Sequence, residues 1–244
     1  MFSELVATLA RLDDDDEVRV IVLRGAGEAA FAAGADIGEL GSGIAPGPRG
    51  ATADGGGSGA QPSRPDAGAR PDGATGGIGA RKPVVAMIHG YCIGGGLLVA
   101  LGADIRLAAT DARFAIPAVR LGVGYPYPGV RQLVGAVGPA AAAELLLTGE
   151  RFDATDALRW GLVSRVFPAS SLEDAVRRTA LAIAQGAPLS VAAAKASISA
   201  VTAGSPTDGV AAAEQAIAAC WASEDMAEGR QAFAEKRPAR FRGR

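Results

Sequence analysis

Three consecutive glycines, Gly94 to Gly96, have the type and spacing that could support chemistry. They stand between a short apolar run, Val84–Ile88, and a second apolar stretch, Leu97–Leu101. Glycines at the start of a helix leave backbone N–H groups open to the atoms of another molecule, and the helix dipole favours negative charge there. The pattern therefore indicates a site for an anion or an oxyanion. Tight packing without a ligand is the alternative that the same pattern allows.

A second segment, Phe31–Ile37, reads FAAGADI and follows a β-branched run at Val18–Leu23. Together with HGYCIGGG at His89–Gly96, it resembles the enoyl-CoA hydratase/isomerase (crotonase) family, and the tail EGRQAFAEKRP is similar to that of the family as well. In that family the two segments face each other across an acyl-CoA thioester. The resemblance covers the whole chain apart from Gly41–Ala80.

The resemblance implies an oxyanion hole made by the backbone N–H groups of Ala35 and Gly95. Two such donors stabilise the negative charge that develops on a thioester oxygen when an enolate forms. Within FAAGADI, the resemblance also implies that Ala33, Asp36 and Ile37 contact the substrate. Asp36 is more typical of a residue that caps the following turn than of a catalytic carboxylate.

Two positions depart from the family pattern. Enoyl-CoA hydratases carry one glutamate two residues after the third glycine and another directly after a proline in the next strand and loop. The matching residues here are Leu98 and Ala118, and neither can carry a proton. Addition of water to a double bond normally uses general acid–base groups, so the sequence argues against classical hydratase or isomerase activity. We expect Leu98 and Ala118 to line the substrate site instead.

Tyr125 is a further candidate catalytic residue. It lies in LGVGY, which resembles a loop of the family's methylmalonyl-CoA decarboxylases, although those enzymes carry a histidine where this chain has Ala35. Decarboxylation to an enolate needs an oxyanion hole and an apolar environment around the departing carboxylate. It does not need a general base. A decarboxylase or related lyase, and a non-catalytic acyl-CoA binder, are therefore alternatives to a hydratase-type enzyme. For Tyr125 itself, simple loop packing is the alternative.

Lys236 lies in the tail at a position where the resemblance implies contact with the CoA phosphates, often across a subunit boundary. A solvated basic C-terminus is the alternative. The resemblance also implies a homotrimer or a dimer of trimers. Coenzyme A would enter as part of the substrate, so we expect no separate cofactor.

Composition excludes several other classes of function. A chain of 244 residues that is 49% hydrophobic can bury a full core in one domain, and a net charge of −2 argues against nucleic acid as a partner. Cys92 and Cys220 give neither a disulfide framework nor a metal cluster, which suits the cytoplasm. His89 is the only histidine, so no metal site or Ser-His-Asp triad is expected and a structural role is predicted for it. No signal peptide and no apolar run of the ~18 residues that a membrane span needs are visible, so no membrane association is expected.

These residues must be positioned by an α/β fold, for which the resemblance implies a crotonase-like ββα spiral core over residues 1–166. The core would be truncated at its N-terminus and interrupted by a disordered insert, because Gly41–Ala80 is too poor in apolar residues to offset its ordering entropy. A helical C-terminal region over 167–244 would serve oligomerisation. Strands are expected at Val18–Leu23, Val84–Ile88, Asp104–Ala108, Arg113–Ile116 and Val163–Val166. Helices are expected at Met1–Leu12, Leu97–Leu101, Val130–Val137, Pro139–Leu147, Ala154–Trp160, Leu172–Gln185, Pro188–Val201, Pro206–Ser223 and Glu224–Lys236.

Overall fold

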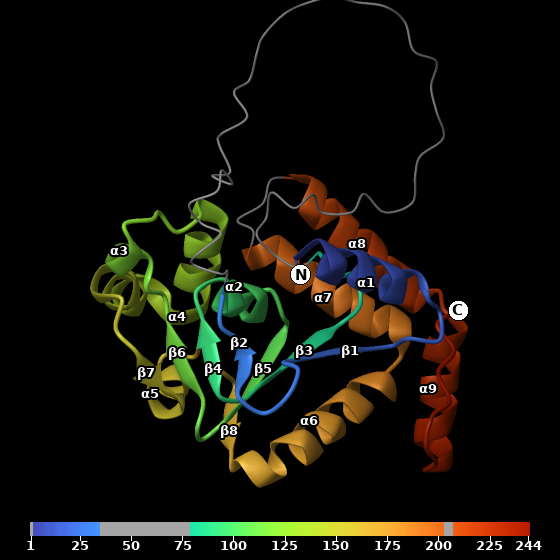
Figure 1. Ribbon diagram of the computed structural model, residues 1–244. Coiled ribbons are helices and arrows are strands. Elements are labelled where there is room, and N and C mark those ends of the chain that lie inside the picture. The colour runs from blue at the N-terminus through green and yellow to red at the C-terminus, as the bar shows by residue number, and fades with distance from the viewer. Residues whose placement is uncertain (1, 35–78, 203–206) are drawn as a thin grey trace, which may run out of the picture.

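A computed structural model of the protein describes residues 2–34, 79–202 and 207–244. Its strands form two four-stranded sheets, and the longest of the described helices, α4, α6, α7 and α8, lie in the second half of the chain (Figure 1). In chain order the described elements are α1 (Phe2–Asp14), β1 (Ile21–Arg24), β2 (Ala30–Ala32), β3 (Val84–Ile88), β4 (Tyr91–Ile93), α2 (Gly95–Leu101), β5 (Ile105–Ala109), β6 (Arg113–Ala115), α3 (Ala118–Leu121), α4 (Tyr127–Thr148), β7 (Phe152–Asp153), α5 (Ala154–Arg159), β8 (Arg165–Phe167), α6 (Ala169–Ala184), α7 (Pro188–Thr202), α8 (Thr207–Trp221) and α9 (Glu224–Glu235).

From β1 to β6 the chain alternates between the two sheets. Strands β1, β3, β5 and β8 lie in this order in one sheet, and β2, β4, β6 and β7 lie in this order in the other. Neighbouring strands are parallel, except that β7 runs antiparallel to β6. Each successive pair of strands from β1 to β6 thus adds one strand to each sheet, and a helix follows the second pair (α2) and the third pair (α3). This arrangement confirms the predicted α/β fold with a ββα spiral core and a helical C-terminal region.

Strand β3 is an interior strand that is buried on both faces. Val84, Ala86 and Ile88 belong to the main core, whereas Val85 and Met87 pack in a second cluster with side chains of α6. A parallel strand covered on both sides reads as a continuous apolar run rather than an alternating one. That is why the sequence predicts β3 with its observed bounds.

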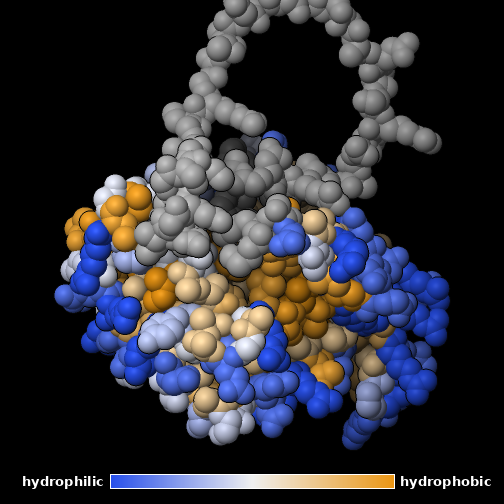
Figure 2. All heavy atoms as spheres, viewed as in Figure 1, coloured by the Kyte–Doolittle hydropathy of each residue, from blue (hydrophilic) through white to orange (hydrophobic). Residues whose placement is uncertain are grey.

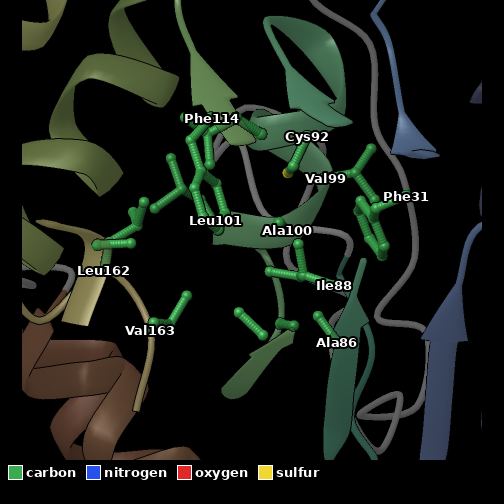
Figure 3. Close-up of a cluster of buried hydrophobic side chains, with 14 of the residues drawn as sticks. Phe31, Ala86, Ile88, Cys92, Val99, Ala100, Leu101, Phe114, Leu162 and Val163 are labelled. Carbon is green, nitrogen blue, oxygen red and sulfur yellow. The ribbon is translucent and has the colours of Figure 1, made fainter. Parts of the chain in front are cut away.

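Helix α2 is at the centre of the main core. Figure 3 shows side chains from both sheets gathered around it. The helix contributes Val99, Ala100 and Leu101, β3 contributes Ala86 and Ile88, and single residues come from β2, β4 and β6, namely Phe31, Cys92 and Phe114. The absence of charged residues in α2 correctly predicts a buried helix, since only its glycine start and Leu98 are partly exposed.

Polar contacts hold the beginning of β3. The backbone N–H of Val84 donates to Oδ2 of Asp104 at 2.7 Å, and Nζ of Lys195 on α7 donates to the same oxygen at 2.8 Å. Lys195 also donates to the carbonyl oxygen of Lys82 at 2.8 Å. Lys195 therefore ties the C-terminal helices to the chain that enters this strand.

Helix α4 combines the two helices that the sequence predicts on either side of Pro139. Gly138 separates them, because its φ of 76° and ψ of 166° are not helical. The whole helix has 22 residues and, by length and composition alone, is apolar enough to cross a membrane. Leu133, Ala142 and Leu145 nevertheless belong to the protein core, and the core helix of a globular protein passes the same test.

Three short strands were not predicted. Strands β2, β4 and β7 have only three, three and two residues. Helix α3, of four residues, was also missed. The predicted insert lies outside the described residues, apart from Gly79 and Ala80.

Candidate functional site

The turn between β4 and α2 is held by an adjacent strand of the same sheet. Gly94 has φ 54° and ψ −113°, a conformation that favours glycine, and its N–H donates to the carbonyl oxygen of Ala115 in β6 at 2.8 Å. The carbonyl oxygen of Gly94 accepts the N–H of Leu98 at 3.2 Å. The peptide group that joins Gly94 to Gly95 therefore has a fixed place at the start of α2.

Gly96 is a glycine because α2 and β2 are in close contact. A Cβ atom added to it would lie 2.3 Å from the carbonyl oxygen of Ala32 and 2.7 Å from the Cβ of Ala32. Backbone atoms at such a distance cannot give way without moving the strand. The glycine run was predicted to be either an anion site or a point of tight packing. For Gly96, tight packing is the explanation.

Gly34 and Gly95 lie close to each other. Gly34, in the FAAGADI segment, has φ 90°, and a Cβ added to it would lie 3.4 Å from the nitrogen of Gly95 and 3.1 Å from the carbonyl oxygen of Ile93. The two segments that the sequence singles out therefore meet at Gly34 and Gly95. Ala33, which precedes Gly34, is exposed.

Three of the predicted site residues, Ala35, Asp36 and Ile37, lie outside the described residues. Their roles as an oxyanion donor and as substrate contacts stay predictions.

The two positions at which the family resemblance places glutamates lie in apolar surroundings. Leu98 is half-buried on α2, and Ala118, at the start of α3, is 8% exposed and belongs to the main core. A Cβ added to Gly129 on α4 would lie 2.7 Å from Cδ1 of Leu98 and 2.9 Å from Cε1 of Tyr125. Gly129 thus leaves room for both side chains. The sequence reasoning missed it, and its only signal was a glycine directly before a predicted helix.

Tyr125 reaches the glycine turn from the loop between α3 and α4. Its ring packs against the main core, and its hydroxyl donates to the carbonyl oxygen of Gly94 at 3.4 Å. Burial raises the pKa of the Tyr125 phenol, with a smaller contribution from Cys92, and burial also raises the pKa of the Cys92 thiol. Both groups therefore stay protonated at neutral pH, so Tyr125 is a hydrogen-bond donor here and not a base.

His89 does not join these residues through its ring. Its Nε2 lies 3.1 Å from the carbonyl oxygen of Gly27, and its buried Nδ1 has no hydrogen-bond partner among the described residues. The backbone carbonyl of His89 accepts the N–H of Phe31 at 2.9 Å, which helps to align β2 with the end of β3. These contacts fit the structural role predicted for this histidine. In the described part of the chain no group of three His, Cys, Asp or Glu side chains could hold a metal ion.

Lys236 lies away from the glycine turn within one chain. It is exposed at the end of α9, and Figure 1 shows α9 at the edge of the molecule, apart from α2 and β4. The adjacent Arg237 is engaged with Glu228, at 2.6 Å and 3.0 Å. The structure of a single chain therefore does not bring Lys236 to the other predicted site residues.

The Glu228 contacts predict a pH-dependent stability of the C-terminal tail. The side-chain hydrogen bond from Arg237 is the main cause that lowers the pKa of Glu228 to about 2, and the N–H of Arg240 adds a second bond at 2.8 Å. Because an unfolded glutamate has a pKa near 4.3, the stabilisation is complete above that value and is lost as the pH falls toward 2. Glu228→Gln should therefore lower the melting temperature at pH 7, and the difference from the unmodified protein should shrink below pH 4.

Glu214→Gln, at an exposed position of α8, is the matched control and should leave the melting temperature unchanged. An equal loss for Glu228→Gln at pH 3 and at pH 7 would contradict the prediction.

Comparison with known proteins gives a consistent result. The sequence model of the family described as enoyl-CoA hydratase/isomerase matches residues 1–51 and 78–244. A carnitinyl-CoA dehydratase from Proteus mirabilis (strain HI4320) is 37% identical over 245 aligned positions, which cover 99% of this chain and 88% of the relative. A carnitinyl-CoA dehydratase from Citrobacter koseri is also 37% identical, over 95% of this chain and 84% of its own length.

Solved structures are similar over the whole chain. A putative enoyl-CoA hydratase/isomerase family protein from Hyphomonas neptunium has a TM-score of 0.80 at 32% identity, and the match covers 100% of this chain and 88% of that one. A probable enoyl-CoA hydratase/isomerase from Mycobacterium abscessus has a TM-score of 0.76 at 40% identity, over 99% of this chain and 88% of its own.

Proposed function

Because this chain belongs to the enoyl-CoA hydratase/isomerase family, we propose that it binds an acyl-CoA thioester and stabilises negative charge on the thioester oxygen. The N–H of Gly95 is the first proposed donor, and that of Ala35, which follows Gly34 directly in the chain, is the second. The observation that carries this proposal is the close approach of Gly34 to the nitrogen of Gly95. Because glycine has no Cβ, neither residue places a side chain at this meeting point.

The relatives support a coenzyme A thioester as the substrate. Those from Proteus mirabilis and Citrobacter koseri are named for carnitinyl-CoA, which is such a thioester. Coenzyme A is then part of the substrate, and no separate cofactor is proposed. The proposed substrate contacts are Ala33, Asp36, Ile37, Leu98 and Ala118.

Enolate stabilisation without a carboxylate pair defines the reaction that we propose. Leu98 and Ala118 supply neither a base for water nor an acid for the α-carbon, and burial keeps Tyr125 protonated. Chemistry that depends mainly on the oxyanion donors fits this site better than classical hydration. Loss of a carboxylate from a methylmalonyl-CoA type of substrate is the second candidate, because Leu98, which lies beside Gly129, and Ala118, which belongs to the main core, are both apolar.

A trimer, or a dimer of trimers, is the proposed assembly, with Lys236 contacting the CoA phosphates of a neighbouring subunit. Large exposed apolar side chains support an interface, because a subunit contact would remove them from water. Trp221 and Phe233 in the C-terminal region are 71% and 88% exposed, and Figure 2 shows further apolar side chains over α3, where Val119 and Leu121 are exposed.

The proposed function is tested by measuring the binding of butyryl-CoA by calorimetry, together with turnover of crotonyl-CoA and of methylmalonyl-CoA. Binding with release of carbon dioxide from methylmalonyl-CoA would identify the decarboxylase, and binding without turnover of either compound would identify a non-catalytic binder. Absence of butyryl-CoA binding, together with no turnover of crotonyl-CoA or methylmalonyl-CoA, would overturn the proposal.

A further inference from the structure

The peptide group between Gly94 and Gly95 is contacted from two elements besides its own turn. Its carbonyl oxygen accepts the N–H of Leu98 from α2 and the hydroxyl of Tyr125 from the loop before α4, at 3.2 Å and 3.4 Å. The preceding N–H of Gly94 is fixed by β6 through Ala115. The position of this peptide group is therefore determined by several parts of the fold at once.

The two ends of this peptide group face opposite directions. The described chain contains no cis peptide bond, so the C=O of Gly94 and the N–H of Gly95 are antiparallel. The C=O end faces Tyr125, and Gly34 lies close to the nitrogen at the other end. The hydroxyl of Tyr125 and the proposed thioester oxygen would thus lie on opposite sides of one peptide group.

We propose that Tyr125 is a positioning residue, whose hydroxyl holds and polarises the Gly94–Gly95 peptide so that the N–H of Gly95 becomes a stronger oxyanion donor. The inference rests on the proposed function, because it assigns a role to a residue that acts on the proposed donor and does not touch the substrate. Hydrogen bonds in series polarise one another, and each one strengthens its neighbour by roughly 10–30%. A hydroxyl donated to the carbonyl oxygen therefore strengthens the bond that the attached N–H can donate.

Two features of the site support this role. Burial raises the pKa of Tyr125, so the hydroxyl keeps its hydrogen and can only donate toward a carbonyl oxygen. Gly129 leaves the space that the ring occupies, since a Cβ there would lie 2.9 Å from Cε1 of Tyr125. Simple loop packing would also bury the ring, but it would not require the hydroxyl to meet the carbonyl oxygen of Gly94.

The test is infrared difference spectroscopy of butyryl-CoA labelled with ¹³C at its carbonyl and bound to the full-length protein. Binding to the unmodified protein should shift the C=O stretch to lower wavenumber. Tyr125→Phe should reduce that shift by about 10–30%. Gly129→Ala keeps the hydroxyl but displaces the ring, and should reduce the shift as well. Tyr127→Phe is the matched control, because Tyr127 is 78% exposed, and should leave the shift unchanged.

The outcomes separate this inference from the proposed function. If the unmodified protein fails to bind butyryl-CoA or binds it without a shift, the proposed function fails and the inference with it. If the unmodified protein shows the shift and Tyr125→Phe shows it in full, the inference alone is overturned. Should Tyr125→Phe not fold, as judged by its melting curve, Gly129→Ala decides the question, and an undiminished shift in that variant overturns the inference.

Discussion

Hydration of crotonyl-CoA by this protein should be several orders of magnitude slower than by a family member that carries glutamates at the positions of Leu98 and Ala118. A positioned general acid or base typically contributes about 10²–10⁴ in rate, and both are absent here. Binding of the thioester should persist, because the proposed oxyanion donors belong to the backbone. The measurement is the decay of the absorbance of the conjugated double bond, with the thioester at saturating concentration.

Introducing both carboxylates should increase hydration. The double variant Leu98→Glu with Ala118→Glu places acid–base groups where the resemblance implies them, and Gly129 leaves some space beside position 98. Some stability should be lost, because Ala118 is part of the core and a buried carboxylate is costly unless it is paired. Ala140→Glu is the matched control, since it adds a glutamate at an exposed position of α4 and should leave the rate unchanged. Rapid hydration by the unmodified protein would contradict the prediction and would assign proton transfer to another side chain.

Replacing Gly96 by alanine should destabilise the protein and weaken acyl-CoA binding together. The added Cβ would lie 2.3 Å from the carbonyl oxygen of Ala32, so α2 must move away from β2. Inserting an extra carbon into a well-packed core typically costs about 1–3 kcal/mol, and backbone cannot rotate away as a side chain can. The same movement would separate Gly34 from Gly95 and so disrupt the proposed site. Urea unfolding gives the change in stability, and calorimetry with butyryl-CoA gives the change in affinity.

Gly135→Ala provides the control for this variant. Gly135 also lies in a helix, but an added Cβ would meet no atom within 4 Å. Alanine is favoured over glycine in a helix interior by roughly 0.5–1 kcal/mol, so this change should leave the protein equally or more stable. Equal stability of Gly96→Ala and the unmodified protein would show that β2 and α2 are less tightly packed than the structure indicates.

The sequence predicted those elements whose own residue types indicate how deeply they are buried or where they end. The apolar run Val84–Ile88 and the uncharged helix after it could be placed correctly, because continuous apolar character requires burial on all sides. The break at Gly138 could be placed because proline cannot continue a helix interior. Strands β2, β4 and β7 could not be found, since two or three residues show no periodicity and their pairing depends on distant parts of the chain.

The candidate site was predictable in part. The meeting of the FAAGADI segment with the glycine turn, now seen at Gly34 and Gly95, followed from the family resemblance. The roles of Gly96 and Gly129 did not follow, because a glycine that makes room for a neighbour in space looks the same in sequence as one that makes room for a ligand. The direction of the Tyr125 hydroxyl could not be predicted from the sequence either, since it depends on how the loop before α4 returns to α2.

The burial of β3 on both faces has a consequence for the uniqueness of the fold. If a strand has one solvent-exposed face, a register shift of one residue would bring its apolar side chains into water. The free-energy cost of that exposure selects a single register. In β3, a slip would exchange one apolar set for another, so its side chains discriminate weakly between alignments. The polar contacts of Asp104 with Val84 and Lys195 discriminate strongly, because a shifted strand would leave a carboxylate without its N–H partner. Asp104 thus specifies which alignment forms, and with it where the glycine turn lies.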